Sequence, residues 1–186
     1  TGDYLMALST IGANQIASIT SAAMPTGSVL QVQRTQFTGT NTISTTNNVW
    51  NVMTDLTVNI TPTSTSSTIM LQLFLGGWEH SASEDHMCYF GFYRDSTLLV
   101  APTSGSRTET VGMGATNFTG DDHLTTPAVA WINYFDTPSS TSQITYKGAM
   151  MELSNGDFYL NRTQTDANSS GHERSVSTIV ATEIAG

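Results

Sequence analysis

The chain has 186 residues and a formal net charge of −9, and only 11% of its residues are charged, less than half of the roughly 25% usual in soluble domains. Its six Lys and Arg are scattered, so no basic patch is available for phosphates, which argues against a nucleic-acid partner. No apolar run approaches the ~20 residues that span a bilayer, and an anionic surface does not dock on anionic lipids, so we predict no membrane insertion.

Cys88 is the only cysteine, which excludes an internal disulfide and a thiolate metal cluster. It lies inside an apolar stretch, where a cysteine is typically a small buried hydrophobe. A disulfide-free domain used outside a cell needs another source of stability, and we expect oligomerisation to supply it.

The first 24 residues differ from the rest of the chain. They are rich in Ala, Ser and Ile and lack a period of two, and Leu8, Ile11 and Gln15 belong to a weak coiled-coil seam. Two interpretations remain open: a short helix, or an irregular arm that packs on a neighbouring subunit. Pro25-Thr26-Gly27 ends this segment. We therefore divide the chain into an arm, 1–24, and a head domain, 25–186.

The first half of the head alternates as β-strands do. Strands are predicted at 28–37, 49–60 and 68–75. We expect Gly76-Gly77 to bend or bulge the last of them. Loops are predicted at 39–48 and 78–86.

The stretch 87–102 is predicted to be a buried strand, a polar turn and a second strand, closed by Pro102. Asn155-Gly156 has the residues that a type I′ hairpin needs, and we expect 158–161 to pair back on the strand before it. The remaining predicted strands are 111–113, 128–135, 144–153 and 176–184, and the remaining predicted loops are 117–123 and 162–174. Eight to ten strands with regular turns and no interior helix predict an all-β fold, an antiparallel, jelly-roll-like β-sandwich.

No catalytic motif is present: the chain lacks G-x-S-x-G, H-E-x-x-H, a Gly-rich phosphate loop and C-x-x-C. Loop carboxylates are numerous but their spacing selects no pair for glycoside cleavage. Two loops, around Glu79–His86 and Asp121–His123, hold His, Asp and Glu that could bind a divalent ion if three converged, but solvated loop residues are the preferred interpretation. We predict a protein that is not an enzyme and has no cofactor or metal.

Recognition by such a chain would fall to its loops. Five aromatic residues lie in strands and are predicted to be mostly core: Trp131, Tyr134, Phe135, Phe90 and Phe92. Trp78 borders a loop and could either cover the edge of the sandwich or stack on a sugar ring. The candidate receptor-binding residues are Trp78, His80, Asp85, His86, Asn117, Asp121, Asp122 and His123, with the 162–174 loop as a further candidate.

Several segments resemble the C-terminal head domains of tail fibres and related virion appendages of marine bacteriophages, such as those that infect cyanobacteria. They are the Pro-x-Gly-Ser-Val-Leu-Gln-Val opening at 25–32, LTVNITPTSTSSTIM at 56–70, FYRDST at 92–97, YFDTPSSTSQITYK at 134–147, YLNRTQTD at 159–166 and STIVATEI at 177–184. The matches run from Pro25 to the end of the chain and are poorest in the long loops.

The resemblance implies a homotrimeric β-sandwich head on the surface of the phage particle, joined by the arm to a fibre shaft and to other virion proteins. It implies a tail-fibre tip that binds a host surface glycan or protein, and it carries over no catalytic residue. Two alternatives stay open: a capsid decoration or cement protein, and a polysaccharide-degrading tailspike. The tailspike alternative is the weaker of the two, because tailspikes normally carry a long repeated shaft domain and this sequence shows none.

Overall fold

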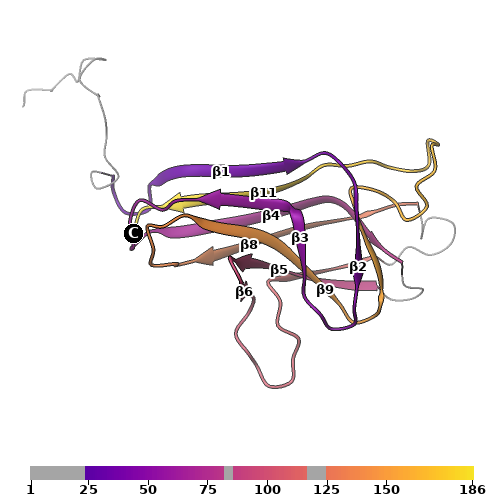
Figure 1. Cartoon of the computed structure of the whole chain (residues 1–186), viewed down its shortest axis with the longest axis horizontal. Helices are drawn as coiled ribbons and strands as arrows, with labels where there is room; N and C mark the ends of the chain where they lie inside the picture. The colour runs from indigo at the N-terminus through magenta and orange to yellow at the C-terminus, as the bar shows by residue number, and fades with distance from the viewer. Residues whose placement is uncertain (1–23, 82–85, 117–124) are drawn as a thin grey trace, which may run out of the picture.

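The computed structural model describes residues 24–81, 86–116 and 125–186, and these residues form strands and loops with no helix. Figure 1 shows most of the strands running along the long axis of the molecule, with β2 crossing it. The strands are β1 (Val29–Phe37), β2 (Asn41–Thr45), β3 (Asn51–Ile60), β4 (Thr68–His80), β5 (His86–Arg94), β6 (Thr97–Leu99), β7 (Gly112–Thr116), β8 (Ala128–Asp136), β9 (Ile144–Glu152), β10 (Gly156–Leu160) and β11 (Ser177–Ile184).

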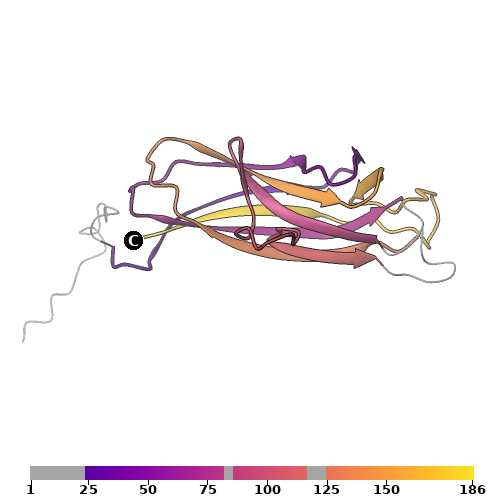
Figure 2. The same ribbon diagram turned by 90° about the horizontal axis from the view of Figure 1, so that it is seen from below.

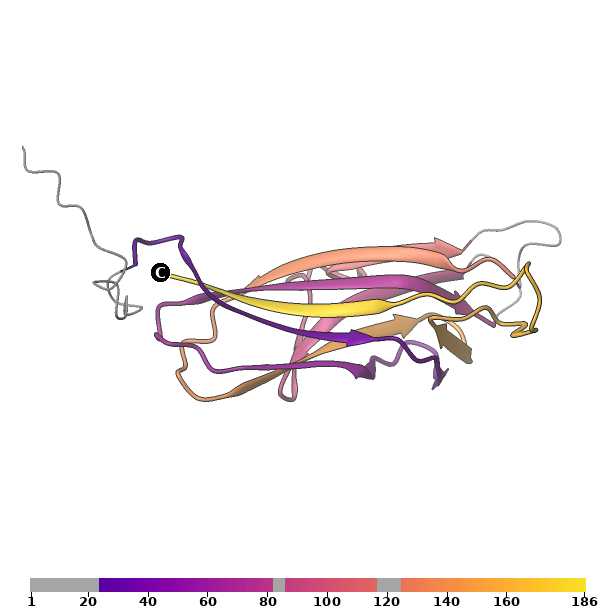
Figure 3. The same cartoon turned by 90° about the horizontal axis from the view of Figure 1, so that it is seen from above.

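The strands pair antiparallel in two sheets, which confirms the predicted β-sandwich. In sheet A, β1, β11, β4 and β8 lie side by side, and β10 and β2 extend the sheet beyond the end of β11 (Figure 3). In sheet B the order is β3, β9, β5, with β6 and β7 both pairing with the free side of β5. When β2 and β10 are set aside and β6 and β7 are counted as one strand, eight strands remain and can be renumbered from 1 to 8 in chain order. The order in sheet A is then 1-8-3-6 and that in sheet B is 2-7-4-5, which is the strand order of a jelly roll.

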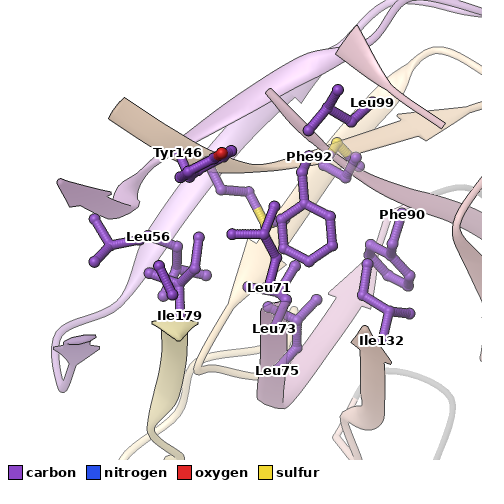
Figure 4. Close-up of a cluster of buried hydrophobic side chains, with 14 of the residues drawn as sticks. Leu56, Leu71, Leu73, Leu75, Phe90, Phe92, Leu99, Ile132, Tyr146 and Ile179 are labelled. Atoms are coloured by element: carbon purple, nitrogen blue, oxygen red, sulfur yellow. The ribbon is translucent and has the colours of Figure 1, made fainter. Parts of the chain in front are cut away.

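The core lies between the two sheets and follows the alternation in the sequence. On β4, Ile69, Leu71, Leu73 and Leu75 are buried while the residues between them are not. They meet aromatic and aliphatic side chains of the facing sheet (Figure 4). Those partners include Leu56, Phe90, Phe92, Leu99 and Tyr146. Burial of such side chains stabilises the fold by roughly 1.5–3 kcal/mol each.

A β-bulge at Gly76-Gly77 changes which face of β4 points inward. The register of β4 with β8 shifts between Leu75 and Trp78. A Cβ on Gly76 would lie 2.2 Å from the carbonyl oxygen of Val176, so the neighbouring chain passes too close for any side chain there. An inserted residue reverses the alternation, and Trp78 and His80 therefore face the core. The predicted bulge is confirmed, and β4 continues beyond it for three residues that we had assigned to a loop.

Two further loop and hairpin predictions are wrong. Residues 41–45 form β2 instead of part of a loop, because β10 supplies a pairing partner from far along the chain. Gly156 begins β10, but β10 pairs with β2 and β4 and not with β9. Neither Asn155 nor Gly156 has a positive φ, so the chain crosses to the other sheet at this point instead of closing a type I′ turn.

The described chain enters and leaves at the same end of the sandwich, here called the proximal pole. Gly27 donates its backbone N–H to the carbonyl of Ala185, and Ala185 donates to Ser28, both at 2.8 Å. The loop 162–176, the distal loop, lies at the opposite end, the distal pole (Figures 1 and 2). The predicted arm lies almost entirely outside the described residues.

Candidate recognition surfaces

Trp78 does not offer a stacking face, so its prediction as a receptor contact is wrong. Its side chain is fully buried and lies edge-on to Phe90 and parallel to Phe158, with ring centroids 5.3 and 5.9 Å away. The reversed alternation after Gly76-Gly77 places it there. Trp78 is therefore a core residue around which the aromatic side chains at the distal pole pack.

His80 is also buried, and it belongs to a polar cluster that ties the two sheets together. Its imidazole Nε2 contacts the carboxylate of Glu152, which also accepts hydrogen bonds at 3.0 Å from the Cys88 thiol and the Thr45 hydroxyl. Burial, together with the charge and hydrogen bond of Glu152, raises the pKa of Cys88 well above its usual value. The thiol is thus protonated and enclosed, an arrangement that suits packing and not nucleophilic attack.

The other predicted receptor residues fall in or beside segments that the structure does not describe. Asp85, Asn117, Asp121, Asp122 and His123 lie outside the described residues. The backbone of His86 begins β5 and pairs with Thr116 of β7. Across residues 24–81, 86–116 and 125–186, no three His, Cys, Asp or Glu are grouped to hold a metal ion, and no helix there is long and apolar enough to cross a membrane.

The distal loop, already a sequence candidate, forms a polar cavity of about 290 Å³. Asp166 pairs with Arg174 across it, and a backbone bridge joins Arg162 to Arg174 at its base. The hydrogen bond from Arg174 lowers the pKa of Asp166, so its carboxylate stays charged at neutral pH. His172 accepts from or donates to the Ser169 hydroxyl at 2.8 Å. The lining residues are Asp166, Ala167, Asn168, Ser169, His172 and Arg174.

Asn161 anchors both ends of this loop. It is fully buried in the left-handed conformation, with φ of 60°. Its amide donates to the carbonyls of Phe37 and Gly39 at 2.9 Å, and its side-chain oxygen accepts from Ser177 at 2.6 Å. Asn tolerates this backbone conformation better than most residues. The cavity is thereby fixed to β1 and β11. The individual residues of the cavity were not identified from the sequence, because the opposite charges of Asp166 and Arg174 are its only signal there.

A second surface is the outer face of sheet A, where Trp131 is 71% exposed. The prediction that Trp131 and Phe135 are core residues is wrong: on β8, Ile132 and not its neighbours faces the core. A groove of about 360 Å³ crosses this face, lined by Gln72, Phe74, Trp131, Thr178 and Val180. Alternation on β8 signals two faces but does not say which one is covered.

No family model and no curated protein matches the chain. Among solved structures it is similar to the VP2 subviral particle of infectious bursal disease virus, with 14% identity, a TM-score of 0.34, and coverage of 83% of this chain and 41% of that one. It is also similar to a structure of the Gx strain of the same virus, with 16% identity, a TM-score of 0.31, and coverage of 84% and 38%. The chain thus spans about two fifths of those chains, and likenesses of this size carry no argument about function.

Proposed function

We propose that the chain is the head of a virion structural protein, a tail-fibre tip that binds the host cell surface with loops at the distal pole. The resemblance of six segments to phage appendage heads supports this. The observation that carries it is the polarity of the head: the chain enters and leaves at the proximal pole, and the polar cavity lies at the opposite one. A head attached through the arm presents the distal loop outward.

The chemistry of the cavity suits a glycan. A carboxylate and a guanidinium, Asp166 and Arg174, can hydrogen-bond sugar hydroxyls, and the amide of Asn168 adds both a donor and an acceptor. A shallow polar site of this kind binds weakly. Three heads on a fibre, and several fibres on a particle, would raise the avidity by about 10²–10⁴ where the geometry permits.

The test uses phage that carry the paired substitution Asn168→Ala and His172→Ala, which leaves the Asp166–Arg174 pair intact. We expect adsorption to the host bacterium to fall about tenfold, one lost contact per head being amplified by avidity. The matched control, Thr141→Ala with Ser142→Ala, removes two exposed polar side chains at the proximal pole and should adsorb normally. Unchanged adsorption by the first variant would remove the distal loop from the site.

A capsid decoration protein is the second candidate, favoured by one observation. The outer face of sheet A exposes several large apolar side chains, among them Val32, Trp131 and Phe135, as a surface that lies flat on other subunits would. Immunogold labelling of intact particles separates the two candidates, since antibody to the chain would mark tail appendages in one case and the capsid in the other.

We propose binding and not catalysis for this head. The thiol, imidazole and carboxylate that meet in the described part of the chain, Cys88, His80 and Glu152, are enclosed between the sheets. A polysaccharide-degrading tailspike is therefore the weakest of the three candidates. Release of reducing sugar from host polysaccharide by the purified chain would revive it.

A further inference from the structure

The outer face of sheet A is organised in rows that cross its four long strands. Strand register places Phe74 directly opposite Trp131, and Met70 directly opposite Phe135. Between these rows Gln72 lies opposite Asn133. On β11 and β1, Thr178 and Gln36 continue the row of Phe74 and Trp131. Thr182 and Val32 continue the row of Met70 and Phe135, and Val180 and Arg34 continue the row of Gln72 and Asn133. A polar row thus lies between an aromatic row and an apolar row.

This face is more apolar than a solvated sheet face normally is. Four large side chains on it are more than half exposed: Val32 at 54%, Val129 at 60%, Phe135 at 56% and Trp131 at 71%. Phe74, at 42%, joins them. Spread over three of the four strands, they together expose on the order of 500 Å² of apolar surface.

The charges of the face favour a second copy of the same chain as its occupant. The chain carries a net charge of −9, so two copies repel each other over most of their surface. In the three rows, Arg34 is the only charged side chain and no carboxylate is present. Copies of the chain therefore meet little charge repulsion at this face, while the apolar side chains supply the attraction.

We propose that the outer face of sheet A is the surface through which copies of this chain associate, with Trp131 and Phe74 as its main aromatic contacts. A standard interface buries about 800 Å² per partner, and the five exposed side chains provide more than half of that area. The aromatic row and the apolar row flank the polar row, so Gln72 and Asn133 can hydrogen-bond a neighbouring copy while the flanking rows exclude water from the contact. This location of the contact does not depend on host binding by the distal loop. The number of copies, three, rests on the proposed function.

The paired variant Phe74→Gln with Trp131→Gln tests the proposal in the full chain. Both side chains point away from the core, so we expect the β-sheet circular dichroism to stay unchanged. Light scattering should show the wild type as an oligomer and the variant as a monomer at the same micromolar concentration, with the dissociation constant raised about 100-fold. The matched control is Met87→Gln with Met113→Gln on sheet B, whose side chains are 45% and 57% exposed; it should assemble as the wild type does.

A second measurement avoids removal of the aromatic pair. Asn133→Cys places a thiol in the polar row, while the native Cys88 is buried. Maleimide should label this thiol slowly in the oligomer and about tenfold faster after dilution to monomer. Equal rates at both concentrations, a monomeric wild type, or an oligomeric paired variant would overturn the proposal. So would a paired variant that keeps its mass but loses binding to host polysaccharide, since the face would then be a sugar platform.

Discussion

The indole of Trp78 and the ring of Phe158 stack with 12° between their planes and 5.9 Å between their centroids. Trp78 lies on β4 beyond the bulge, and Phe158 lies on β10, the strand that pairs with this extension. The contact joins β10, and the part of β4 beyond the bulge, to the main core.

Replacement of Trp78 by Ala should therefore unfold the distal pole. We expect a loss of about 3–5 kcal/mol in the free energy of unfolding, as for other buried tryptophans. Urea denaturation measures it, with Met113→Ala, an exposed position, as the control. A change below about 1 kcal/mol would contradict the packing described here.

Cys88 should resist thiol reagents while the protein is folded. Its sulfur is buried, donates to Glu152 at 3.0 Å, and has a raised pKa, so little thiolate forms. We expect no reaction with a chromogenic disulfide reagent at neutral pH, and one equivalent of thiol after denaturation. Rapid reaction of the native protein would show that the cluster of His80, Cys88 and Glu152 is open to solvent.

Substitutions of Asn161 should separate its backbone and side-chain roles. Asn161→Ala removes the hydrogen bonds to Phe37, Gly39 and Ser177 and retains the left-handed backbone, and we expect a loss of about 2–4 kcal/mol. Asn161→Gly removes the same bonds but relieves the backbone strain, so it should be about 1 kcal/mol less harmful. Thermal melting of both variants gives the comparison, and an Ala variant more stable than the Gly variant would refute it.

Glu183 should make the fold sensitive to acid. Burial acts to raise the pKa of its carboxyl, but hydrogen bonds from Ser67, Gln31 and Thr63 outweigh burial and leave the pKa below its usual 4.5. A lowered pKa in the folded state contributes stability that is complete above the unfolded value and is lost as the pH falls through the folded value. Stability should thus decline below about pH 4.5, and Glu183→Gln, which gives up this contribution at neutral pH, should flatten that decline in urea titrations.

The strands of the core could be predicted from the sequence because alternation is a local property. At 68–75 every second residue is a large aliphatic one, and the structure buries that set between the sheets. The same reasoning could not predict that Trp78 is buried in the core and that Trp131 is exposed. One inserted glycine reverses the alternation before Trp78, and the sequence records the two faces of β8 without showing which of them meets sheet B.

Pairing over long distances was equally hidden. The strand β10 begins at the second residue of Asn155-Gly156, a dipeptide typical of tight hairpins, yet it joins β2, more than a hundred residues earlier in the chain. Local turn chemistry was overridden by the pairing of β10 within sheet A and by the burial of Phe158 and Leu160 in the core. The distal cavity depends on the same long-range contacts, because Asn161 fixes the loop to β1 and β11.

The placement of chain entry and distal loop at opposite poles also sets the mechanical properties of the head. In the proposed attachment, with the particle held through the proximal pole and the cell at the distal loop, tension would run parallel to the strands. The antiparallel ladder between β1 and β11, from Val29 with Ile184 to Phe37 with Ser177, is then loaded in shear. Its hydrogen bonds share the force instead of breaking one after another, so the head resists traction along its long axis better than peeling across it.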